Sequence, residues 1–594
     1  MYRAPLQDLA FALDHVLGSD ALAGCPPFAD FTPDLAASVL EEAARLAEGV
    51  LDPLYGSADR EGAQWSADGV RTPAGFKAAY REFVAGGWPQ LRAAAAYGGQ
   101  GMPAVLVTAV EELFASANLA FRLCPMLTQG ATEAIAHCGS EEQKRRYLPA
   151  MVRGEWTGTM NLTEPQAGSD LSQVRTRALP NGDHYRIHGQ KIFITFGEHD
   201  LAANIVHLVL ARIEGAPAGV KGISLFIVPK FLINEDGTLG ARNDLQCISI
   251  EHKLGIRGSP TCTMVYGQTE GAIGYLLGEA NRGLEYMFVM MNAARLSVGV
   301  EGYAVAERAY QRALEWARTR IQGRPAGAPT AAALPILHHP DVKRMLLTMK
   351  CQIEAMRYLA LYAASQLDLG AHHTDPAVRL AAKARGELLI PIVKGWSTET
   401  GVEIASLGIQ VHGGMGFIEE TGAAQMLRDA RISPIYEGTT GIQAADLIGR
   451  KLGRDGGAAL ALLIADIHRE LEACRRATPA VEPVIRAADE AVQRLDETVR
   501  HLLADIAANP AIGAAVAVPL LRLAGLTFGG WLQARAASRA SALLATHPAE
   551  RNFMQAKLDT SRFYAQQILP QGTGLAQIVR SGAGCVLDSE AALL

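Results

Sequence analysis

The sequence predicts a mainly α-helical protein with a small central β domain. Two changes of pattern indicate this. Apolar residues recur with helical periodicity before about residue 155 and after about residue 279, whereas the residues between form short runs rich in β-branched types. With 594 residues, the chain is long enough for several domains with large cores. We expect an N-terminal helical domain (1–155), an antiparallel β sheet or barrel (156–278), a helical bundle (279–455) and an extra C-terminal helical domain (456–594).

The N-terminal domain is predicted to be helical throughout. Leu35–Leu51 is rich in Ala, Glu and Leu at helical spacing, and Val105–Ala117 has a similar pattern. Helix-breaking residues stand at Cys25-Pro26-Pro27 and at Tyr97–Gly101.

The central domain is predicted to be a small antiparallel sheet or barrel. Its apolar runs include Ile205–Leu210 and Ile223–Val228, and Pro and Gly residues separate such runs.

Long helices return after the central domain. Periodic segments run from Leu284 to Ile321, from Asp341 to Leu369 and from Ala377 to Leu407. The last domain is rich in Ala, and Asn509-Pro510 and His547-Pro548 divide it into helices.

Composition excludes several classes of function. The chain is 49% hydrophobic and 20% charged, with a net charge of −6 and no basic run, which argues against nucleic acid as a partner. Eight scattered cysteines without a Cys-x-x-Cys pair argue against zinc and iron–sulfur sites and for a reducing compartment. The histidine pairs His338-His339 and His372-His373 lack further ligands at metal spacing. We therefore expect no metal.

No membrane span or export signal is expected. The start of the chain lacks a basic region followed by an apolar core. The most apolar stretch, Ala511–Leu532, is interrupted by Pro519 and Arg522, which favours a buried helix. These patterns predict a cytoplasmic protein.

Three segments carry candidate chemistry. They are Met160–Asp170 (MNLTEPQAGSD), Gln190–Thr195 (QKIFIT) and Ile435–Gln443 (IYEGTTGIQ). The third places Glu437 between an aromatic residue and a glycine; taken alone, such a carboxylate is most often a helix-entry residue.

Together these segments closely resemble the signatures of the acyl-CoA dehydrogenase family of flavoproteins, in the family's order and at its usual separations. The resemblance extends to about residue 455. The C-terminal block and the opening Tyr2–Leu9 resemble a longer bacterial branch, whose members act on methylthio-propanoyl, short-chain and long-chain acyl-CoA. The resemblance implies FAD as cofactor, oxidation of an acyl-CoA thioester to the trans-2-enoyl-CoA, and electron transfer to an electron-transfer flavoprotein.

By this resemblance Glu437 is the catalytic base that removes the α-proton, and hydride leaves for flavin N5. An earlier helix carries the base in some relatives, but Ala294 stands at that position, before Arg295. The chemistry requires burial to raise the carboxylate pKa and a donor to stabilise the enolate oxygen. In relatives the N–H of the base and a flavin hydroxyl hold that oxygen.

The family pattern assigns flavin contacts to a set of residues in both halves of the chain. Near the isoalloxazine these are Leu162, Thr163, Phe193, where many relatives have tryptophan, and Thr195. Ile192-Phe193-Ile194 alone would be read as a buried strand. Ser169 matches a contact to the pyrophosphate and to acyl-CoA, although a turn or cap is the local interpretation. The remaining flavin positions are Arg320, Gln322, Gln410, Gly413, Gly414, Thr439 and Gln443.

In relatives the arginine and glutamine pair at 320 and 322 reaches the flavin of a neighbouring subunit, which implies a homodimer or a dimer of dimers. The glycine turn at 413–416 does not follow a strand of a βαβ unit, so nicotinamide binding has little support.

Substrate contacts implied by the resemblance are Ser169, Asn292, Arg295, Tyr436 and Gly438. The acyl group stays open, with short or medium chains and 3-methylmercaptopropionyl preferred. Two alternatives also stay open: an acyl-CoA oxidase on the same scaffold, and a flavin-binding relative without catalytic activity. The intact Glu437 and the acidic net charge argue against the second.

Overall fold

The computed structural model describes residues 1–324, 332–544 and 546–593, without the side chains of Val289 and Asn292. The chain forms two compact units. We call residues 45–102 and 117–294 the sheet unit, and residues 1–44, 103–116 and 295–593 the helical unit. The long helices α5 (Ala104–Cys138) and α7 (Gly283–Thr319) contribute residues to both.

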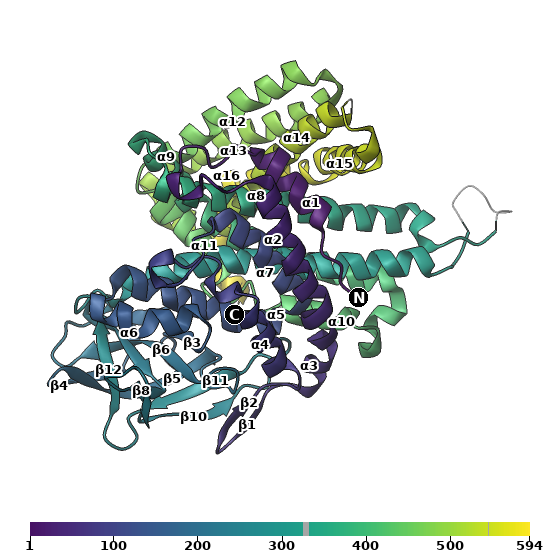
Figure 1. Cartoon of the computed structure of the whole chain (residues 1–594). Helices are drawn as coiled ribbons and strands as arrows, with labels where there is room; N and C mark the ends of the chain where they lie inside the picture. The colour runs from purple at the N-terminus through teal and green to yellow at the C-terminus, as the bar shows by residue number, and fades with distance from the viewer. Residues whose placement is uncertain (325–331, 545, 594) are drawn as a thin grey trace. The chain divides into compact units, whose positions relative to one another are not determined.

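The sheet unit is built on one eight-stranded sheet with the order β10-β11-β5-β12-β7-β6-β3, and β4 pairs with both β5 and β6 (Figure 1). Buried side chains such as Ile187, Val209, Phe226 and Met264 form its core. The strands are β3 (Trp156–Asn161), β4 (Arg177–Asn181), β5 (His184–Thr195), β6 (Asn204–Ile213), β7 (Ile223–Pro229), β10 (Leu245–Ile250), β11 (Thr261–Tyr266) and β12 (Ala272–Leu277).

Two details of the sheet unit differ from the sequence prediction. The sheet is mixed, because β3 and β4 each run parallel to β6, and the long segment between β3 and β6 permits this crossover. The N-terminal part is also not entirely helical: β1 (Gln64–Ser66) and β2 (Gly69–Arg71) form a short hairpin. The dipeptide Asp68-Gly69 stands at its turn, with Gly69 at φ 134°, and this dipeptide is the sequence signal that predicts a hairpin.

The helices of the sheet unit are short apart from its share of α5. They are α3 (Tyr55–Glu61), α4 (Phe76–Ala85) and α6 (Glu141–Val152), and a second hairpin joins β8 (Phe231–Ile233) to β9 (Leu239–Arg242). Ser140 and Gln143 form a capping box that begins α6.

The helical unit confirms the predicted helices and their breaks. The three long periodic segments correspond to α7, α8 (Pro340–His372) and α9 (Pro376–His412). Pro510 begins α14 (Pro510–Leu544), and Pro548 follows its end. The other helices are α1 (Leu6–Phe11), α2 (Pro33–Leu46), α10 (Ala423–Ala430), α11 (Thr440–Asp446), α12 (Ala458–Ala477), α13 (Glu482–Ala508), α15 (Arg551–Phe563), α16 (Gln571–Ser581) and α17 (Ala583–Leu587).

Glycines let helix α9 pack closely against helices from both sides. A Cβ on Gly401 of α9 would lie 2.2 Å from the Gly302 carbonyl oxygen of α7. A Cβ on Gly525 of α14 would lie 2.3 Å from the Trp396 ring of α9. Helix α14 therefore packs directly on α9, and the distance between the two helices leaves no room for a residue larger than glycine at position 525.

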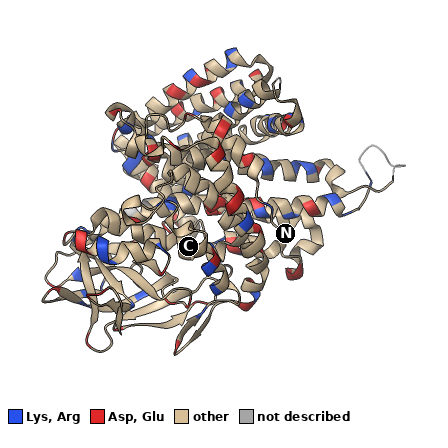
Figure 2. Ribbon diagram, viewed as in Figure 1, with Lys and Arg blue, Asp and Glu red and all other residues tan. Residues whose placement is uncertain are grey.

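Two helices are long and apolar enough to cross a membrane, α5 and α14. The most apolar window of α5 is fully buried inside the structure, and that of α14 is 61% buried, as in core helices of globular proteins. Acidic and basic residues are interspersed along the outer helices α12 and α13 (Figure 2).

Candidate active site

The loop that carries Glu437 is a tight turn between α10 and α11. Its N–H groups bond backward, Tyr436 to the Ile432 carbonyl at 3.2 Å and Thr440 to the Pro434 carbonyl at 3.0 Å. Glu437 has φ 54° and Gly438 has φ 89°. A non-glycine residue in this left-handed region is uncommon, and such strain is concentrated at functional sites.

The chain downstream fixes this loop. Thr439 caps α11 by accepting a hydrogen bond from the Ile442 N–H at 3.2 Å. Gln443, on the first turns of α11, is fully buried, and its Nε2 donates to the carbonyl oxygens of Glu437 at 3.2 Å and Gly438 at 3.3 Å. Both residues thus hold the loop in place, whatever else they contact.

Gly438 cannot be replaced without moving this arrangement. A Cβ at residue 438 would lie 2.6 Å from Gln443 Nε2, and the positive φ is unfavourable for any side chain. In the described part of the chain, the N–H of Glu437 donates to no other group, so it is available to a ligand oxygen.

Burial and the charges around Glu437 act on the pKa of its carboxyl in opposite directions. Burial raises the pKa of its carboxyl, and the positive charges of Arg295 and Lys394 lower it. Arg295 is 3% exposed and lies next to Asp446, with Nη1 3.4 Å from Oδ2. Arg295 therefore contributes to the charge balance of the base from a buried position, and its contact with CoA stays a prediction.

Tyr436 is connected to the same group of side chains. Its hydroxyl donates to Glu301 on α7. Tyr436 and Gly438 are half-buried, as expected for residues that line a binding site.

In the sheet unit, Leu162 and Thr163 directly follow β3. The Leu162 carbonyl accepts a hydrogen bond from Lys191 Nζ at 3.0 Å, and the Thr163 carbonyl accepts one from the Ile192 N–H at 2.9 Å. Neither the N–H nor the hydroxyl of Thr163 donates to another group among the described residues.

A buried ion pair that the sequence analysis missed holds this strand end. Lys191 Nζ lies 2.8 Å from Glu164 Oε1, and both side chains are nearly inaccessible to solvent. Glu164 also accepts hydrogen bonds from the N–H of Arg175 at 2.7 Å and from the N–H and hydroxyl of Thr176. The single acidic residue of MNLTE and the single lysine of QKIFIT, each in or next to a predicted strand, were the available signal.

Phe193 has a strained backbone and an exposed ring. It has φ 60° and lies where β5 and β11 shift register, and its side chain is 58% exposed. This placement overturns the reading of Ile192-Phe193-Ile194 as a simple buried strand. Thr195, two residues on, is half-buried, and its carbonyl accepts a hydrogen bond from the Thr159 hydroxyl at 2.7 Å.

Ser169 lies in an exposed turn next to Gly168, where an added Cβ would meet no atom within 4 Å. Asp170, and not Ser169, caps the following turn by accepting from the Ser172 N–H at 2.9 Å. The Ser169 hydroxyl is therefore not used as a cap.

These residues fit a flavin. A free N–H and hydroxyl at Thr163 suit the hydrogen-bonding edge of the pyrimidine ring, and an exposed aromatic ring at Phe193 offers a stacking surface. The ion pair of Glu164 and Lys191 gives the strand end a defined geometry before any ligand binds.

The predicted flavin contacts beyond Ser169 and the strand end include four positions of the helical unit. Arg320, Gln322, Gln410 and the Gly413-Gly414 turn are all exposed. Trp316 and His412 stack with ring centroids 5.3 Å apart, so the C-terminal ends of α7 and α9 lie side by side. An exposed guanidinium and amide at these joined ends are free to bind an anion. The side chain of Asn292 lies outside the described residues.

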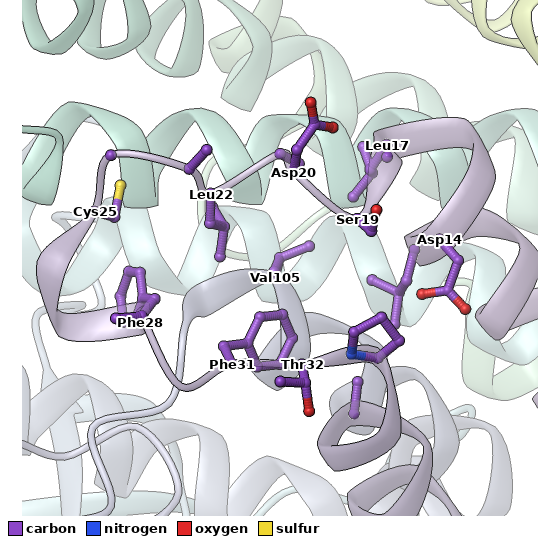
Figure 3. A pocket seen from close by; sticks show the side chains of 18 of the residues that line it. Asp14, Leu17, Ser19, Asp20, Leu22, Cys25, Phe28, Phe31, Thr32 and Val105 are labelled. Carbon is purple, nitrogen blue, oxygen red and sulfur yellow. The ribbon is translucent and has the colours of Figure 1, made fainter.

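A cavity of about 340 Å³ in the N-terminal segment contains none of the predicted site residues (Figure 3). Leu22, Phe28 and Phe31 line it, with Asp14 and Asp20 as its acidic groups. Its lining includes no Lys, Arg or His, so it does not suit a phosphate-bearing ligand.

Family models match almost the whole chain. The acyl-CoA dehydrogenase N-terminal domain matches residues 37–155, its middle domain 159–269 and its C-terminal domain 281–453. A model described as acetyl-CoA dehydrogenase C-terminal like matches residues 463–590.

Curated relatives are similar over the same length. The chain is 48% identical to 3-methylmercaptopropionyl-CoA dehydrogenase of Ruegeria pomeroyi, over 96% of each chain. It is 36% identical to the broad-specificity linear acyl-CoA dehydrogenase FadE5 of Mycobacterium tuberculosis, over 98% of this chain and 97% of the relative. A butyryl-CoA dehydrogenase of Syntrophomonas wolfei is 34% identical, over 99% and 98%.

Solved structures show the same fold. ACDH-11 of Caenorhabditis elegans in complex with C11-CoA superposes with a TM-score of 0.76 at 20% identity, covering 96% of this chain and 92% of that one. An acyl-CoA dehydrogenase of Bacillus anthracis complexed with FAD gives 0.70 at 21% identity, over 98% and 92%. The matches in sequence over the full length place this chain in the acyl-CoA dehydrogenase family, whose members are FAD-dependent oxidoreductases.

Proposed function

We propose that Glu437 is the base of an FAD-dependent dehydrogenation that converts an acyl-CoA thioester into its trans-2-enoyl-CoA. The observation that carries this proposal is the loop itself. It presents a carboxyl of raised pKa at a strained φ of 54°, next to its own available N–H. Strain and a perturbed pKa at one residue together favour a functional role over a helix-entry role.

The loop provides the two functions that proton abstraction needs. The Glu437 carboxylate takes the proton from the carbon next to the thioester carbonyl, and burial makes that carboxylate a stronger base. The Glu437 N–H can donate to the thioester oxygen as negative charge develops there; losing one such donor costs roughly 100-fold or more in rate. Bound FAD supplies the acceptor for the hydride that leaves the β-carbon.

The proposed flavin contacts are the residues assigned by the family pattern. Leu162 and Thr163 would meet the pyrimidine edge, Phe193 the ring face, and Thr195 the region of N5. Ser169, Arg320 and Gln322 would serve the phosphates, with further contacts from Gln410, Gly413, Gly414, Thr439 and Gln443. Because Arg320 and Gln322 are exposed, they can serve a neighbouring copy, which supports a homodimer or a dimer of dimers.

The substrate we propose is a short or medium acyl-CoA, with 3-methylmercaptopropionyl-CoA as the first choice. The name and 48% identity of the Ruegeria relative support that choice. Tyr436, Gly438, Ser169 and Asn292 are the proposed substrate contacts, and electrons would pass to an electron-transfer flavoprotein. All eight cysteines are free, as expected in the cytoplasm.

Anaerobic flavin bleaching tests this proposal. The FAD-loaded protein is mixed with acyl-CoAs from propanoyl and methylthio-propanoyl to palmitoyl, without oxygen. We expect the oxidised flavin band to disappear with methylthio-propanoyl, butanoyl and similar acyl groups. A band that persists with every acyl-CoA would contradict the proposed reaction.

Glu437→Gln tests the base. We expect the variant to keep its yellow colour and to lose at least about 100-fold in kcat, because general-base catalysis contributes roughly 100- to 10,000-fold. Glu420→Gln, at an exposed carboxylate, is the matched control and should keep full activity. Turnover by Glu437→Gln near the wild-type rate would exclude Glu437 as the base. Assays in air and under nitrogen with a redox dye separate a dehydrogenase from an oxidase.

A further inference from the structure

Lys394 is a buried cation whose partner is a backbone carbonyl. It lies on α9 and is fully buried. Its ammonium donates to the Gly438 carbonyl oxygen at 2.7 Å. The ion pairs found among the described residues include none with Lys394. Buried ammonium groups are normally paired with a carboxylate, so a fully buried lysine on a backbone carbonyl calls for a role of its own.

The packing of α9 explains why this side chain points at the Glu437 loop. The next two residues, Gly395 and Trp396, face α14, where Leu521 lies 2.8 Å from a Cβ built on Gly395. On another face, Gly401 closes against α7. With helices packed on these two faces, α9 cannot rotate, and Lys394 is directed to the loop between α10 and α11.

Four charged groups act on Lys394, from the loop, α7 and α9. In the order of their effect on Lys394, they are Glu437 of the loop, Glu301 of α7, Glu399 of α9 and Arg295 of α7. The carboxylates favour the charged ammonium and Arg295 opposes it. Asp446 of α11 and Arg450, which follows that helix, act on Arg295 and so belong to the same group of charges. Helix α14 contributes the apolar Leu521.

We propose that Lys394 is a positioning residue for proton abstraction: its ammonium fixes the Gly438 carbonyl and its charge keeps the nearby Glu437 ionised. This inference rests on Glu437 being the base. The hydrogen bond to Gly438 and those from Gln443 hold the two carbonyls of the turn, so the Glu437 N–H keeps one direction. The charge acts through space on the carboxylate and opposes burial, which raises its pKa.

The two roles can be separated by three substitutions. Lys394→Gln keeps a donor for Gly438 and most of the volume but removes the charge. Lys394→Met removes both, and Lys394→Arg keeps the charge. Lys451→Met is the matched control, because Lys451 lies near the surface and its nearest described carboxylate is Glu387 at 3.5 Å.

The measurement is the pH dependence of kcat/KM for each FAD-loaded variant. Burial lowers the pKa of Lys394 to about 8, so the comparison is made below pH 8, where the wild-type lysine carries its charge. We expect the rising limb, which reports ionisation of Glu437, to move to higher pH by about one unit in Lys394→Gln and Lys394→Met. On the plateau, Lys394→Met should also lose roughly tenfold or more. Lys394→Arg and Lys451→Met should keep the wild-type limb.

A purely structural role predicts a different result. The limb would then stay at the wild-type pH in Lys394→Gln and Lys394→Met, and this outcome would overturn the proposal. If Lys394→Met does not fold, Lys394→Gln decides the question, since glutamine keeps a polar donor in place of the ammonium. Failure of the base assignment is recognised separately: Glu437→Gln would turn over normally. An inactive Glu437→Gln with an unmoved limb in Lys394→Gln would reject the role of Lys394 alone.

Discussion

Two groups of buried and half-buried charges lie among the described residues of the helical unit, and they are built in opposite ways. The first, which we call the Arg357 network, comprises Asp8, Glu112, Glu307, Lys350, Glu354, Arg357 and Lys557. Here every carboxylate touches a cation: Arg357 lies 2.5 Å from Glu112 and 2.9 Å from Glu307. The second, the base cluster, comprises Arg295, Glu301, Lys394 and Glu437. Among the described contacts, Glu437 has no ion pair.

The pKa directions of Asp8 and Glu437 express this difference, whereas burial also raises the pKa of Glu112, which is paired with Arg357. The charges of Lys350 and Lys557 outweigh burial and hold the pKa of Asp8 well below its usual range. For Glu437 the order is reversed, and burial outweighs Arg295 and Lys394. The comparison teaches that paired charges hold helices together, whereas a carboxylate kept short of a partner remains reactive.

Arg357→Met should give the largest effect on stability. It leaves Glu112 and Glu307 buried without their cation, and breaking a buried pair in this way costs roughly 3–5 kcal/mol. Urea unfolding followed by circular dichroism measures the loss, with Arg476→Met at an exposed arginine as control. A change below about 1 kcal/mol would show that the network does not stabilise the fold.

Gly438→Ala should have an intermediate effect, mainly on activity. A Cβ at φ 89° costs about 1–2 kcal/mol, and it would displace Gln443 Nε2, 2.6 Å away. Because small misplacements of a reacting group cost up to roughly 100-fold, we expect kcat to fall at least tenfold. Gly441→Ala is the matched control, since its Cβ would meet its nearest neighbour at 3.7 Å. Equal kinetics for the two variants would mean that the turn does not position the base.

The smallest predicted effect is on the pH dependence of stability, which should change with opposite sign in Asp8→Asn and in Glu437→Gln. Asp8 has a depressed pKa in the fold, so its stabilisation is present above its unfolded pKa of about 3.9 and is lost as pH falls. Asp8→Asn should therefore lose more stability relative to wild type as pH rises from about 3 to 5.

Glu437 has a raised pKa, so its ionisation costs stability above an unfolded pKa of about 4.3. Glu437→Gln should therefore gain stability relative to wild type as pH rises above about 4.3, the opposite sign to Asp8→Asn. Urea midpoints from pH 3 to 7 test both variants. The same sign for the two would remove the distinction between the clusters.

The sequence alone predicts the helical elements because their signals are local. Periodic apolar residues marked α7, α8 and α9, and Pro510 and Pro548 marked the breaks in the last domain. The parallel pairing of β3 with β6 could not be read in this way, because it joins residues about 50 positions apart and leaves no local pattern.

The residues of the candidate site also fall into two groups, those with a local sequence signal and those without one. Glu437 and the residues beside it were identified from a contiguous motif. Lys394 was missed, since a lone lysine in a long helix reads as a solvated residue, and only the packing of α9 between α7 and α14 buries it. Arg295 was found, but its burial against Asp446 required the fold.

The close contact of Gly525 with Trp396 bears on how this chain can be recombined. The C-terminal block cannot be exchanged as a separate module, because its helix α14 packs on α9 without room for one more carbon atom at position 525. A chimaera that exchanges residues 456–593 should therefore carry α9 with it, from the same parent. Grafted alone, a foreign block with any side chain at position 525 would meet the indole ring and shift the helix that bears Lys394.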